Sequence, residues 1–486
     1  MTVTATPQTR TPAIEVLDTP DLGDRSYVVE LDGLAVVVDP QRDIDRIQQI
    51  LDRNGWQVSH VIETHMHNDY VSGGLVLAEE LSAGYVVPVG HEYQFSALEM
   101  GEGDTFESGD MSWRVLHTPG HTPHHVSYAV SVDGKDEAVF TGGSLLFGSV
   151  GRPDLIGPEA TEGLAHAQWK SVRKLVEGID DSAAVMPTHG FGSFCSATAT
   201  VGLESTIGQQ ATTNPAALLD EHEFVTELLE GLDAFPAYYK HMGPANEQGA
   251  REIDLSPADV ADADELRRRI EAGEWVVDLR QRRLWAAEHL AGSLSFDAEG
   301  NAITYLGWLI PWGTPITLLG ATQEQISEFQ RAMARIGIDR PAGQNVGTPA
   351  SWARSAADLG SVRRATFPEL ADALAADGKL IVVDARRRTE WQEGHVDGAR
   401  HIPLHDLPEA IGQVKAWSDA AKHAGADPTV WVSCGSGFRA SVAGSLLARA
   451  GVPTVIVDDD FTNAAKAGLD VVADAHDTML GAAYSD

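Results

Sequence analysis

The chain has 486 residues, of which 43% are hydrophobic and 22% are charged, and its net charge at pH 7 is −36. This length is near that of three average domains, and the composition excludes a largely disordered chain. A field this negative repels nucleic acids and anionic membranes, so we expect neither as a partner.

Two cysteines exclude a disulfide scaffold and a thiolate metal cluster. The sequence contains no apolar run of about 18 residues, so we expect no membrane span. The stretch MTVTATPQTRTP lacks the apolar region of a secretory signal. We therefore expect a cytoplasmic protein.

Strands and helices alternate over the first 200 residues. The β-rich runs IEVLDT, SYVVEL and LAVVVDP are separated by Gly and Asp turns, which predicts short strands between residues 13 and 60. Residues 43–54 have the pattern of a short helix, and VSHVIETH is a strand that ends in histidines. Residues 213–245 are more helical.

Histidines follow three of these predicted strands. THMHNDY supplies His65, His67 and Asp69, HTPGHTPHH supplies His121, and MPTHGFGSFC supplies His189. Imidazole and carboxylate are common ligands of zinc and iron. Four histidines and an aspartate at strand ends of one domain predict a metal site. These five residues are its candidate ligands.

The order H-x-H-x-D, P-G-H-T, F-T-G and a late T-H-G resembles the metallo-β-lactamase superfamily, from residue 13 to about residue 245. The resemblance implies an αββα sandwich with a metal at one edge of two packed sheets. HNDYVSGG, PGHT and GRPDL (151–155) look like the persulfide dioxygenases within it. That implies one Fe(II) per chain, held by two His and one Asp, and oxidation of a persulfide such as glutathione persulfide by O2 to sulfite.

Two positions depart from the superfamily pattern. Tyr70 stands where dinuclear hydrolases have histidine, and Gly143 stands where an aspartate is expected. A hydroxide bridging two metals needs a carboxylate or its equivalent, so these departures disfavour dinuclear hydrolysis. Several arrangements stay open. The resemblance implies His65 and His121 as ligands, and His67 completes a three-histidine iron site with them, with Asp69 and His189 as weaker candidates. Otherwise Asp69 or water fills the gap, zinc replaces iron, or the domain holds no productive metal.

Three residues are candidate substrate contacts. The guanidinium of Arg152 suits the carboxylate of glutathione. Cys195 lies in a G-S-x-C run that, in fused dioxygenase–sulfurtransferases, is near the iron, so the resemblance implies that it carries or positions a persulfide; the alternative is a small buried hydrophobe. Tyr70, beside the metal motif, is the third candidate.

An internal repeat occupies the second half of the chain. WVVDLRQRRLWAAEHLAGSL (275–294) matches IVVDARRRTEWQEGHVDGAR (381–400) at a constant offset of 106 residues. Each copy has buried-looking strands followed by helices, which predicts two α/β domains with parallel sheets. The shared Arg and Trp positions are interpreted as fold residues.

The second copy carries a cysteine in a glycine-rich loop. In VWVSCGSGFRAS, Cys434 follows four β-prone residues and precedes an alanine-rich helix. Loop N–H groups and the positive end of a helix stabilise a thiolate, and Arg439 adds positive charge or orients the loop. The arrangement predicts a nucleophile for an anionic substrate. We expect the loop residues Gly435, Ser436, Gly437 and Phe438 to cradle a persulfide.

The segment 362–475 resembles a rhodanese domain, through VVDAR, EGHVDGARHIP and C-x-x-G-x-R. Four residues separate Cys434 from Arg439, whereas the related cysteine phosphatases enclose five, which favours sulfur transfer. The resemblance implies that Cys434 takes the outer sulfur of a persulfide or thiosulfate and passes it to sulfite, a thiol or cyanide. Gly320 aligns with Cys434 in the first copy, so we expect no transfer there and a spacing or docking role instead.

The whole order resembles fused persulfide dioxygenase–rhodanese proteins, with a dioxygenase-like domain (1–250), a degenerate rhodanese (256–345) and an active rhodanese (361–486). The implied function is persulfide oxidation coupled to sulfane-sulfur transfer, with a low-molecular-weight thiol persulfide, sulfite, thiosulfate and O2 as partners. Self-association is common among such proteins, so we expect a homo-oligomer. The alternatives are a sulfurtransferase without oxygen chemistry, a sulfane-sulfur carrier or sensor, and a zinc-dependent hydrolase.

Overall fold

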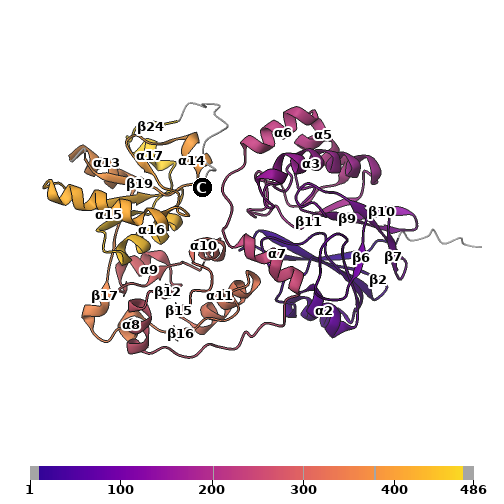
Figure 1. The fold of residues 1–486 in the computed structure, drawn as a ribbon, viewed down its shortest axis with the longest axis horizontal. Helices are drawn as coiled ribbons and strands as arrows, with labels where there is room; N and C mark the ends of the chain where they lie inside the picture. Colours follow the sequence, from indigo (N-terminus) through magenta and orange to yellow (C-terminus); the bar gives the residue numbers. More distant parts are fainter. Residues whose placement is uncertain (1–9, 201, 299, 377–378, 474–486) are drawn as a thin grey trace, which may run out of the picture. The chain divides into compact units, whose positions relative to one another are not determined.

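The computed structural model describes residues 10–200, 202–298, 300–376 and 379–473. The chain divides into two compact units (Figure 1). One comprises the described residues up to 254 together with 331–339, and the other comprises the remainder. The outermost parts of the predicted first and last domains, 1–9 and 474–486, lie outside the described residues.

Two sheets form the centre of the first unit. The first sheet has the order β1 (Ala13–Thr19), β2 (Asp24–Leu31), β3 (Leu34–Val38), β4 (Gln57–Ile62), β5 (Gly84–Pro88) and β6 (Leu98–Met100). The second has the order β11 (Ala184–Pro187), β10 (Lys135–Gly142), β9 (Val126–Val132), β8 (Met111–His117) and β7 (Thr105–Ser108). The strands predicted between residues 13 and 60 are therefore present.

The helices of this unit lie between and after those strands along the chain. They are α1 (Asp45–Asn54), α2 (Gly74–Leu81), α3 (Pro158–Gly178), α4 (Ile207–Thr213), α5 (Pro215–Leu218), α6 (Glu221–Glu230) and α7 (Tyr239–Gln248). The predicted helix over 43–54 is α1, and the helical stretch near 213–245 is divided among short helices.

The two sheets pack face to face through a shared apolar core. Alternate residues of β8 point inward, so Trp113 is fully buried and stacks against Phe106 and Phe140. Residues of β2 and β3 join the same core. The outer face of the first sheet is covered by α1 and α2, and that of the second by α3 and α6. This confirms the predicted αββα sandwich.

Residues 331–339 are counted in this first unit. Arg335 forms ion pairs with Asp43 at 2.7 Å and with Asp21 at 3.1 Å, and its carbonyl accepts a 2.7 Å hydrogen bond from Val71 N–H. Val71 directly follows the H-x-H-x-D-Y motif. A segment from late in the chain therefore stabilises the loop that carries the motif.

The second unit contains two parallel sheets. One has the order β14 (Leu294–Ser295), β12 (Trp275–Asp278), β15 (Ile316–Gly320) and β16 (Gly343–Val346). The other has the order β18 (Arg363–Ala365), β23 (Thr454–Val457), β22 (Val430–Ser433), β19 (Ile381–Asp384) and β21 (Arg400–His401). The prediction of parallel sheets is confirmed.

Helices and two short strand pairs complete this unit. The helices are α8 (Ala263–Glu271), α9 (Arg282–Ala287), α10 (Ala302–Leu309), α11 (Gln323–Arg335), α12 (Pro349–Trp352), α13 (Phe367–Ala376), α14 (Arg388–Glu393), α15 (Leu407–His423), α16 (Phe438–Arg449) and α17 (Asn463–Lys466), with a 3-10 turn at Ala356–Asp358. The pairs are β13 (His289–Leu290) with β17 (Leu359–Gly360), and β20 (His395–Val396) with β24 (Val471–Val472). Within the described ranges, no helix is long and apolar enough to cross a bilayer.

The repeat seen in the sequence is also a repeat of contacts. Arg280 binds Asp278 at 2.7 Å in the first copy, and Arg386 binds Asp384 at 2.7 Å in the second. The tryptophan of each copy stacks on the histidine four residues later, with ring centroids 3.9 Å apart in one copy and 3.5 Å in the other. These shared positions therefore stabilise the segment that follows β12 in the first copy and β19 in the second.

Candidate functional site

Three imidazoles gather at one edge of the sandwich, where strands of both sheets end. His65 follows β4, His121 follows β8 and His189 follows β11. All three are buried, and one ligand atom of each lies within 4.8 Å of the others. The strands bring together residues 124 positions apart in sequence, which is why three separate motifs form one cluster.

Each of the three rings is oriented by a hydrogen bond at Nδ1. The Nδ1 of His65 contacts the hydroxyl of the preceding threonine at 2.9 Å. The Nδ1 of His121 contacts the carbonyl of Arg152 at 2.9 Å, and that of His189 contacts Asp24 Oδ1 at 2.8 Å. Such contacts fix the tautomer and direct Nε2 toward a metal. The three rings therefore present Nε2 atoms as possible ligands.

The donor atoms at the centre fit a cation. The Nε2 atoms of His65 and His189 lie 3.2 Å apart. Among the described residues, His121 Nε2 and Asp69 Oδ1 are buried and have no hydrogen-bond partner. Buried polar atoms are almost always bonded, so unpartnered atoms around one point indicate a ligand. Three imidazole nitrogens suit zinc or iron.

The electrostatics of the cluster differ from ring to ring. Burial, reinforced by the neighbouring histidines, lowers the pKa of His65 well below its usual range, and burial lowers that of His121 to about 3. Burial also opposes protonation of His189, but Asp69 and Asp24 outweigh it and raise its pKa. Two rings are thus neutral, with lone pairs free, while two carboxylates compensate a positive charge at the third.

The ring of His67 lies beside that of His65, with ring centroids 4.2 Å apart, but its Nε2 contacts other side chains. Its Nε2 lies 3.2 Å from Glu63 Oε2, 3.3 Å from Asp39 Oδ1 and 3.0 Å from the hydroxyl of Tyr70. Burial opposes its charge, but Asp39 and Glu63 prevail and raise its pKa to about 9. Its Nδ1 is unpartnered in the described structure, and it forms a second ligand-type group with Asp69 and His189.

Tyr70 is fully buried and stacks on His67, with ring centroids 4.3 Å apart. Its hydroxyl donates a 3.3 Å hydrogen bond to the carbonyl of Asp39. The side chain therefore holds the ring of His67 in place.

Arg152 and Cys195 lie beside the cluster and are both buried. The guanidinium of Arg152 makes two 2.7 Å hydrogen bonds to Asp154 and stacks over Phe235. The thiol of Cys195 is 3.8 Å from the Tyr239 hydroxyl, and burial together with nearby carboxylates raises its pKa well above the usual range. Arg152 thus orients His121 through its carbonyl, and Cys195 is a neutral thiol.

Gly143 directly follows β10 and packs against the ring of His121. Its N–H donates a 3.0 Å hydrogen bond to His125 Nε2, and its carbonyl accepts a 2.9 Å hydrogen bond from Gly151. Only glycine fits at this position because the imidazole of His121 lies so close to its backbone.

In the second unit, Cys434 begins the loop between β22 and α16 and is buried. The N–H of Gly437 donates to its Sγ at 3.1 Å. Gly437 has φ of 93° and precedes the first residue of α16, so the turn favours glycine. The loop carbonyl of Gly435 accepts a 2.9 Å hydrogen bond from Phe461. The sulfur therefore lies at a helix N-terminus and receives a backbone donor.

Arg439 reaches Glu390 of α14 rather than open solvent. Its Nη2 binds Glu390 Oε1 at 2.7 Å, and its Nη1 binds the other carboxylate oxygen. Burial would raise the pKa of Glu390, but the bonds from Arg439 outweigh it and lower the pKa to about 2. The pair orients the arginine beside the loop.

Glu390 and Asp24 were not among the residues expected from the sequence. Asp24 lies 165 positions from the histidine it contacts, and Glu390 lies 49 positions from Arg439. No local motif marks either residue. Only the pairing of distant strands and helices shows them.

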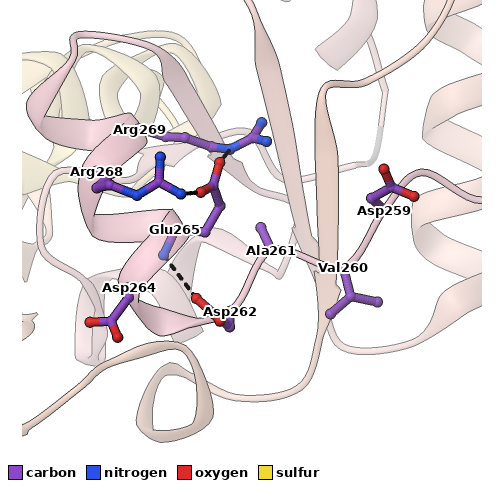
Figure 2. Close-up of a pocket in the computed structure, with 8 residues that line it drawn as sticks. All are labelled: Asp259, Val260, Ala261, Asp262, Asp264, Glu265, Arg268 and Arg269. Atoms are coloured by element: carbon purple, nitrogen blue, oxygen red, sulfur yellow. Dashed lines mark hydrogen bonds and ion pairs between the residues drawn. The ribbon is translucent and has the colours of Figure 1, made fainter.

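A separate surface pocket occurs where α8 begins (Figure 2). Its lining residues are Asp259, Val260, Ala261, Asp262, Asp264, Glu265, Arg268 and Arg269. Glu265 pairs with both arginines, and Asp262 caps α8 through a 2.9 Å bond to the Glu265 N–H. None of these eight residues is a histidine or cysteine, so the pocket offers no nucleophile or soft metal ligand.

Comparison with known proteins identifies the families of two domains. The sequence profile of the metallo-beta-lactamase superfamily matches residues 21–189, and that of the rhodanese-like domain matches residues 366–466. A metallo-beta-lactamase structure from Staphylococcus aureus subsp. aureus COL matches with a TM-score of 0.63 and 25% identity, covering 70% of this chain and all of the other.

Two curated relatives are hydroxyacylglutathione hydrolases. That of Methylococcus capsulatus is 32% identical over 168 residues, which cover 33% of this chain and 61% of the relative. That of Rhizobium etli is 30% identical over 153 residues, which cover 31% and 56% respectively. This chain thus spans little more than half the length of these relatives. Together, the profiles, the fold and the sites show a metallo-β-lactamase-fold domain followed by a rhodanese-like domain.

Proposed function

We propose that the first domain oxidises a low-molecular-weight persulfide at one iron ion and that the last domain transfers sulfane sulfur through Cys434. The observation that carries the first part is the cluster of His65, His121 and His189, whose Nε2 atoms face one another while each Nδ1 is tied back. The observation that carries the second is the Gly437 N–H donated to the Cys434 sulfur.

The three histidines would hold the iron through their Nε2 atoms, in place of the two histidines and one aspartate implied by resemblance. His189 would give up to the ion the proton that Asp69 and Asp24 favour on its ring. Iron supplies the capacity to bind O2 and a sulfur substrate at adjacent open positions. Asp24 would keep His189 oriented, and the carbonyl of Arg152 would do the same for His121. Asp69, whose Oδ2 lies 3.2 Å from His189 Nδ1 and whose Oδ1 has no partner among the described residues, is a second source of negative charge.

The overall reaction balances with O2 as the oxidant. A persulfide, O2 and water give a thiol and sulfite, the outer sulfur losing four electrons that O2 accepts. The absence of a side chain at Gly143 leaves no carboxylate to bridge two metals. Among the described residues, the ligand-type group of His67 and Asp69 shares His189 with the three-imidazole cluster, so His189 cannot complete both groups at once. Within the described structure, these features favour a mononuclear site.

At Cys434 the proposed chemistry is nucleophilic. The thiolate attacks the outer sulfur of thiosulfate, a new S–S bond forms, and sulfite leaves with the electron pair of the bond that breaks. A thiol, cyanide or sulfite then attacks the outer sulfur of the Cys434 persulfide and returns the thiolate. The loop N–H groups stabilise the negative sulfur. Two activities on one chain raise the concentration of sulfite available to Cys434.

Glutathione is the proposed thiol because the curated relatives are hydrolases of glutathione thioesters by name. The same names favour a second candidate, hydrolysis of an acyl-glutathione thioester with zinc. The two candidates make opposite demands on the metal. Hydrolysis needs a metal-bound water but no redox change, whereas persulfide oxidation needs iron and O2.

A metal exchange on the full chain separates the candidates. Protein loaded with Fe(II) without oxygen and protein loaded with Zn(II) are each given glutathione persulfide with O2, or a hydroxyacyl-glutathione thioester. We expect sulfite only from the iron form with the persulfide, and little thioester cleavage from either form. Rapid thioester cleavage by the zinc form, without sulfite from the iron form, would establish the hydrolase instead.

A further inference from the structure

The repeat copy that lacks a nucleophile contributes directly to the surroundings of Cys434. Ser295 of β14 hydrogen-bonds Ser441 of α16 at 2.9 Å, with both hydroxyls buried. The ring of Tyr305 in α10 contacts that of Phe438, with centroids 5.8 Å apart. Both partners belong to α16, whose N-terminus carries the cysteine loop. The first copy is therefore packed against the helix that supports the nucleophile.

We propose that Arg282, which begins α9 of this degenerate copy, is a positioning residue for sulfur transfer at Cys434. Its Nε donates to Asp458 Oδ1 at 2.9 Å, and its Nη2 donates to the carbonyl of Ser436 at 3.3 Å. Ser436 lies in the middle of the cysteine loop. This inference rests on the proposed sulfur transfer and assigns to the degenerate copy a part in that same site.

A cation is needed beside the cysteine loop because the carboxylate of Asp458 lies there. A Cβ added to Gly437 would lie 2.0 Å from Asp458 Oδ1, so this carboxylate is packed against the residue whose N–H binds the sulfur. The side chain of Asp458 is only 6% exposed. An uncompensated carboxylate in such a position repels both the Cys434 thiolate and an anionic sulfur donor.

Two arginines compensate that carboxylate from opposite copies. Arg364 of the active copy donates to Asp458 Oδ2 at 2.7 Å, and Arg282 of the degenerate copy occupies Oδ1. Arg282 also donates to the loop carbonyl of Ser436. The arginine from the degenerate copy thus does two things, neutralising Asp458 and holding the loop so that its N–H groups face the sulfur.

The repeat-equivalent residue behaves differently, which argues against a shared fold role. Arg388 occupies the same position in the active copy, and it donates to Gln392 of its own helix at 3.1 Å. Arg282 instead crosses to the other copy. A residue kept only for the fold would make the same contact in both copies, as Arg280 and Arg386 do.

The test uses the full chain and two readouts, thiosulfate-to-cyanide sulfur transfer and the rate of Cys434 alkylation by iodoacetamide. The variants are Arg282→Ala, Arg282→Lys, and Arg283→Ala as the matched control, because Arg283 is the exposed neighbour on the same helix. Thermal unfolding of each variant confirms folding. Wild-type and Cys434→Ser protein first establish whether transfer depends on Cys434.

We expect Arg282→Ala to lower kcat and kcat/KM together, by roughly tenfold, and to slow alkylation. Arg282→Lys restores part of both, and Arg283→Ala changes neither. Adding Asp458→Asn to Arg282→Ala should recover activity, since the repelling charge is gone. If Arg282→Ala matches Arg283→Ala in both readouts, the proposal is wrong. If wild-type protein transfers no sulfur, the proposed function fails, while the alkylation rates still decide the role of Arg282.

Discussion

The imidazole of His121 occupies the space that a side chain on Gly143 would need: a Cβ built there would lie 2.2 Å from His121 Cδ2 and 2.8 Å from its Nε2. The missing aspartate and the position of the histidine are therefore one feature. The ring fills the place of the carboxylate, so the chain cannot regain that ligand by a single substitution.

Replacement of Gly143 should consequently damage the site even when the new residue is a ligand. Gly143→Asp and Gly143→Ala are both expected to displace His121, because heavy atoms cannot approach within 3.0 Å of a Cβ without movement. We expect bound iron after anaerobic loading, measured by elemental analysis, to fall in both variants. Gly163→Ala is the control, since its Cβ would meet nothing within 4 Å. Higher iron content with full activity in Gly143→Asp would contradict this account.

Removal of single histidines should show which rings hold the metal. His121→Ala and His189→Ala are each expected to weaken iron binding by at least about tenfold, as loss of a ligand or of its orienting contact does. His124→Ala, a histidine outside the cluster, is the control. The affinity is measured by competition with a chromophoric chelator. Retention of iron by His189→Ala but loss by His67→Ala would assign the third position to His67.

The two activities should separate cleanly in one variant. Cys434→Ser is expected to reduce thiosulfate-dependent sulfur transfer to background because serine is a poor nucleophile without a general base. O2 consumption with glutathione persulfide should remain near the wild-type rate. The two assays are run on the same preparation. Loss of both activities would mean that Cys434 delivers sulfur to the first domain.

The ion pair behind the cysteine loop predicts a particular acid sensitivity. Burial would raise the pKa of Glu390, but Arg439 lowers it to about 2 from 4.5, so the carboxylate binds fewer protons in the folded chain. Its contribution, on the order of 2 kcal/mol, is complete above pH 4.5 and is lost as the pH falls toward 2. Urea unfolding followed by Trp fluorescence between these pH values measures it.

The control for that prediction is the exposed Glu393 on the same helix. Glu393→Gln should keep the wild-type pH dependence, whereas Glu390→Gln should remove this component and lower stability at pH 7, since it leaves Arg439 with a weaker partner. Parallel pH curves for the wild type and Glu390→Gln would show that the pair contributes little.

Much of the fold follows from local sequence. The β-rich runs separated by Gly and Asp turns predicted strands between residues 13 and 60, and the repeated Val-Val-Asp segments predicted two parallel sheets. The sandwich itself was implied by the resemblance to the metallo-β-lactamase superfamily. These patterns are local because burial along a strand has a period of two residues. In each copy of the repeat, the shared arginine and aspartate also bind each other within a few residues. The pairing of Arg335 with Asp43, by contrast, joins residues 292 positions apart and has no sequence signature.

The candidate site was only partly predictable for the same reason. The residue types at strand ends indicated a metal. The choice between His67 and His189 depends on Glu63, four residues before His67, and on Asp24 and Asp39, which approach from other strands. The sequence repeat likewise suggested that Arg282 is a fold residue. Its contact with Asp458 depends on how the two copies pack against each other, and the sequence of either copy alone does not show that packing.

The central claim is that the three-histidine cluster supports oxygen chemistry on a persulfide. The most direct measurement is O2 uptake, in an electrode cell, by the iron-loaded full chain given glutathione persulfide, with His121→Ala beside it. We predict uptake with sulfite formed in equal amount, abolished in the variant. No uptake above the protein-free blank, with Cys434-dependent sulfur transfer intact, would contradict the claim and leave the chain a sulfurtransferase.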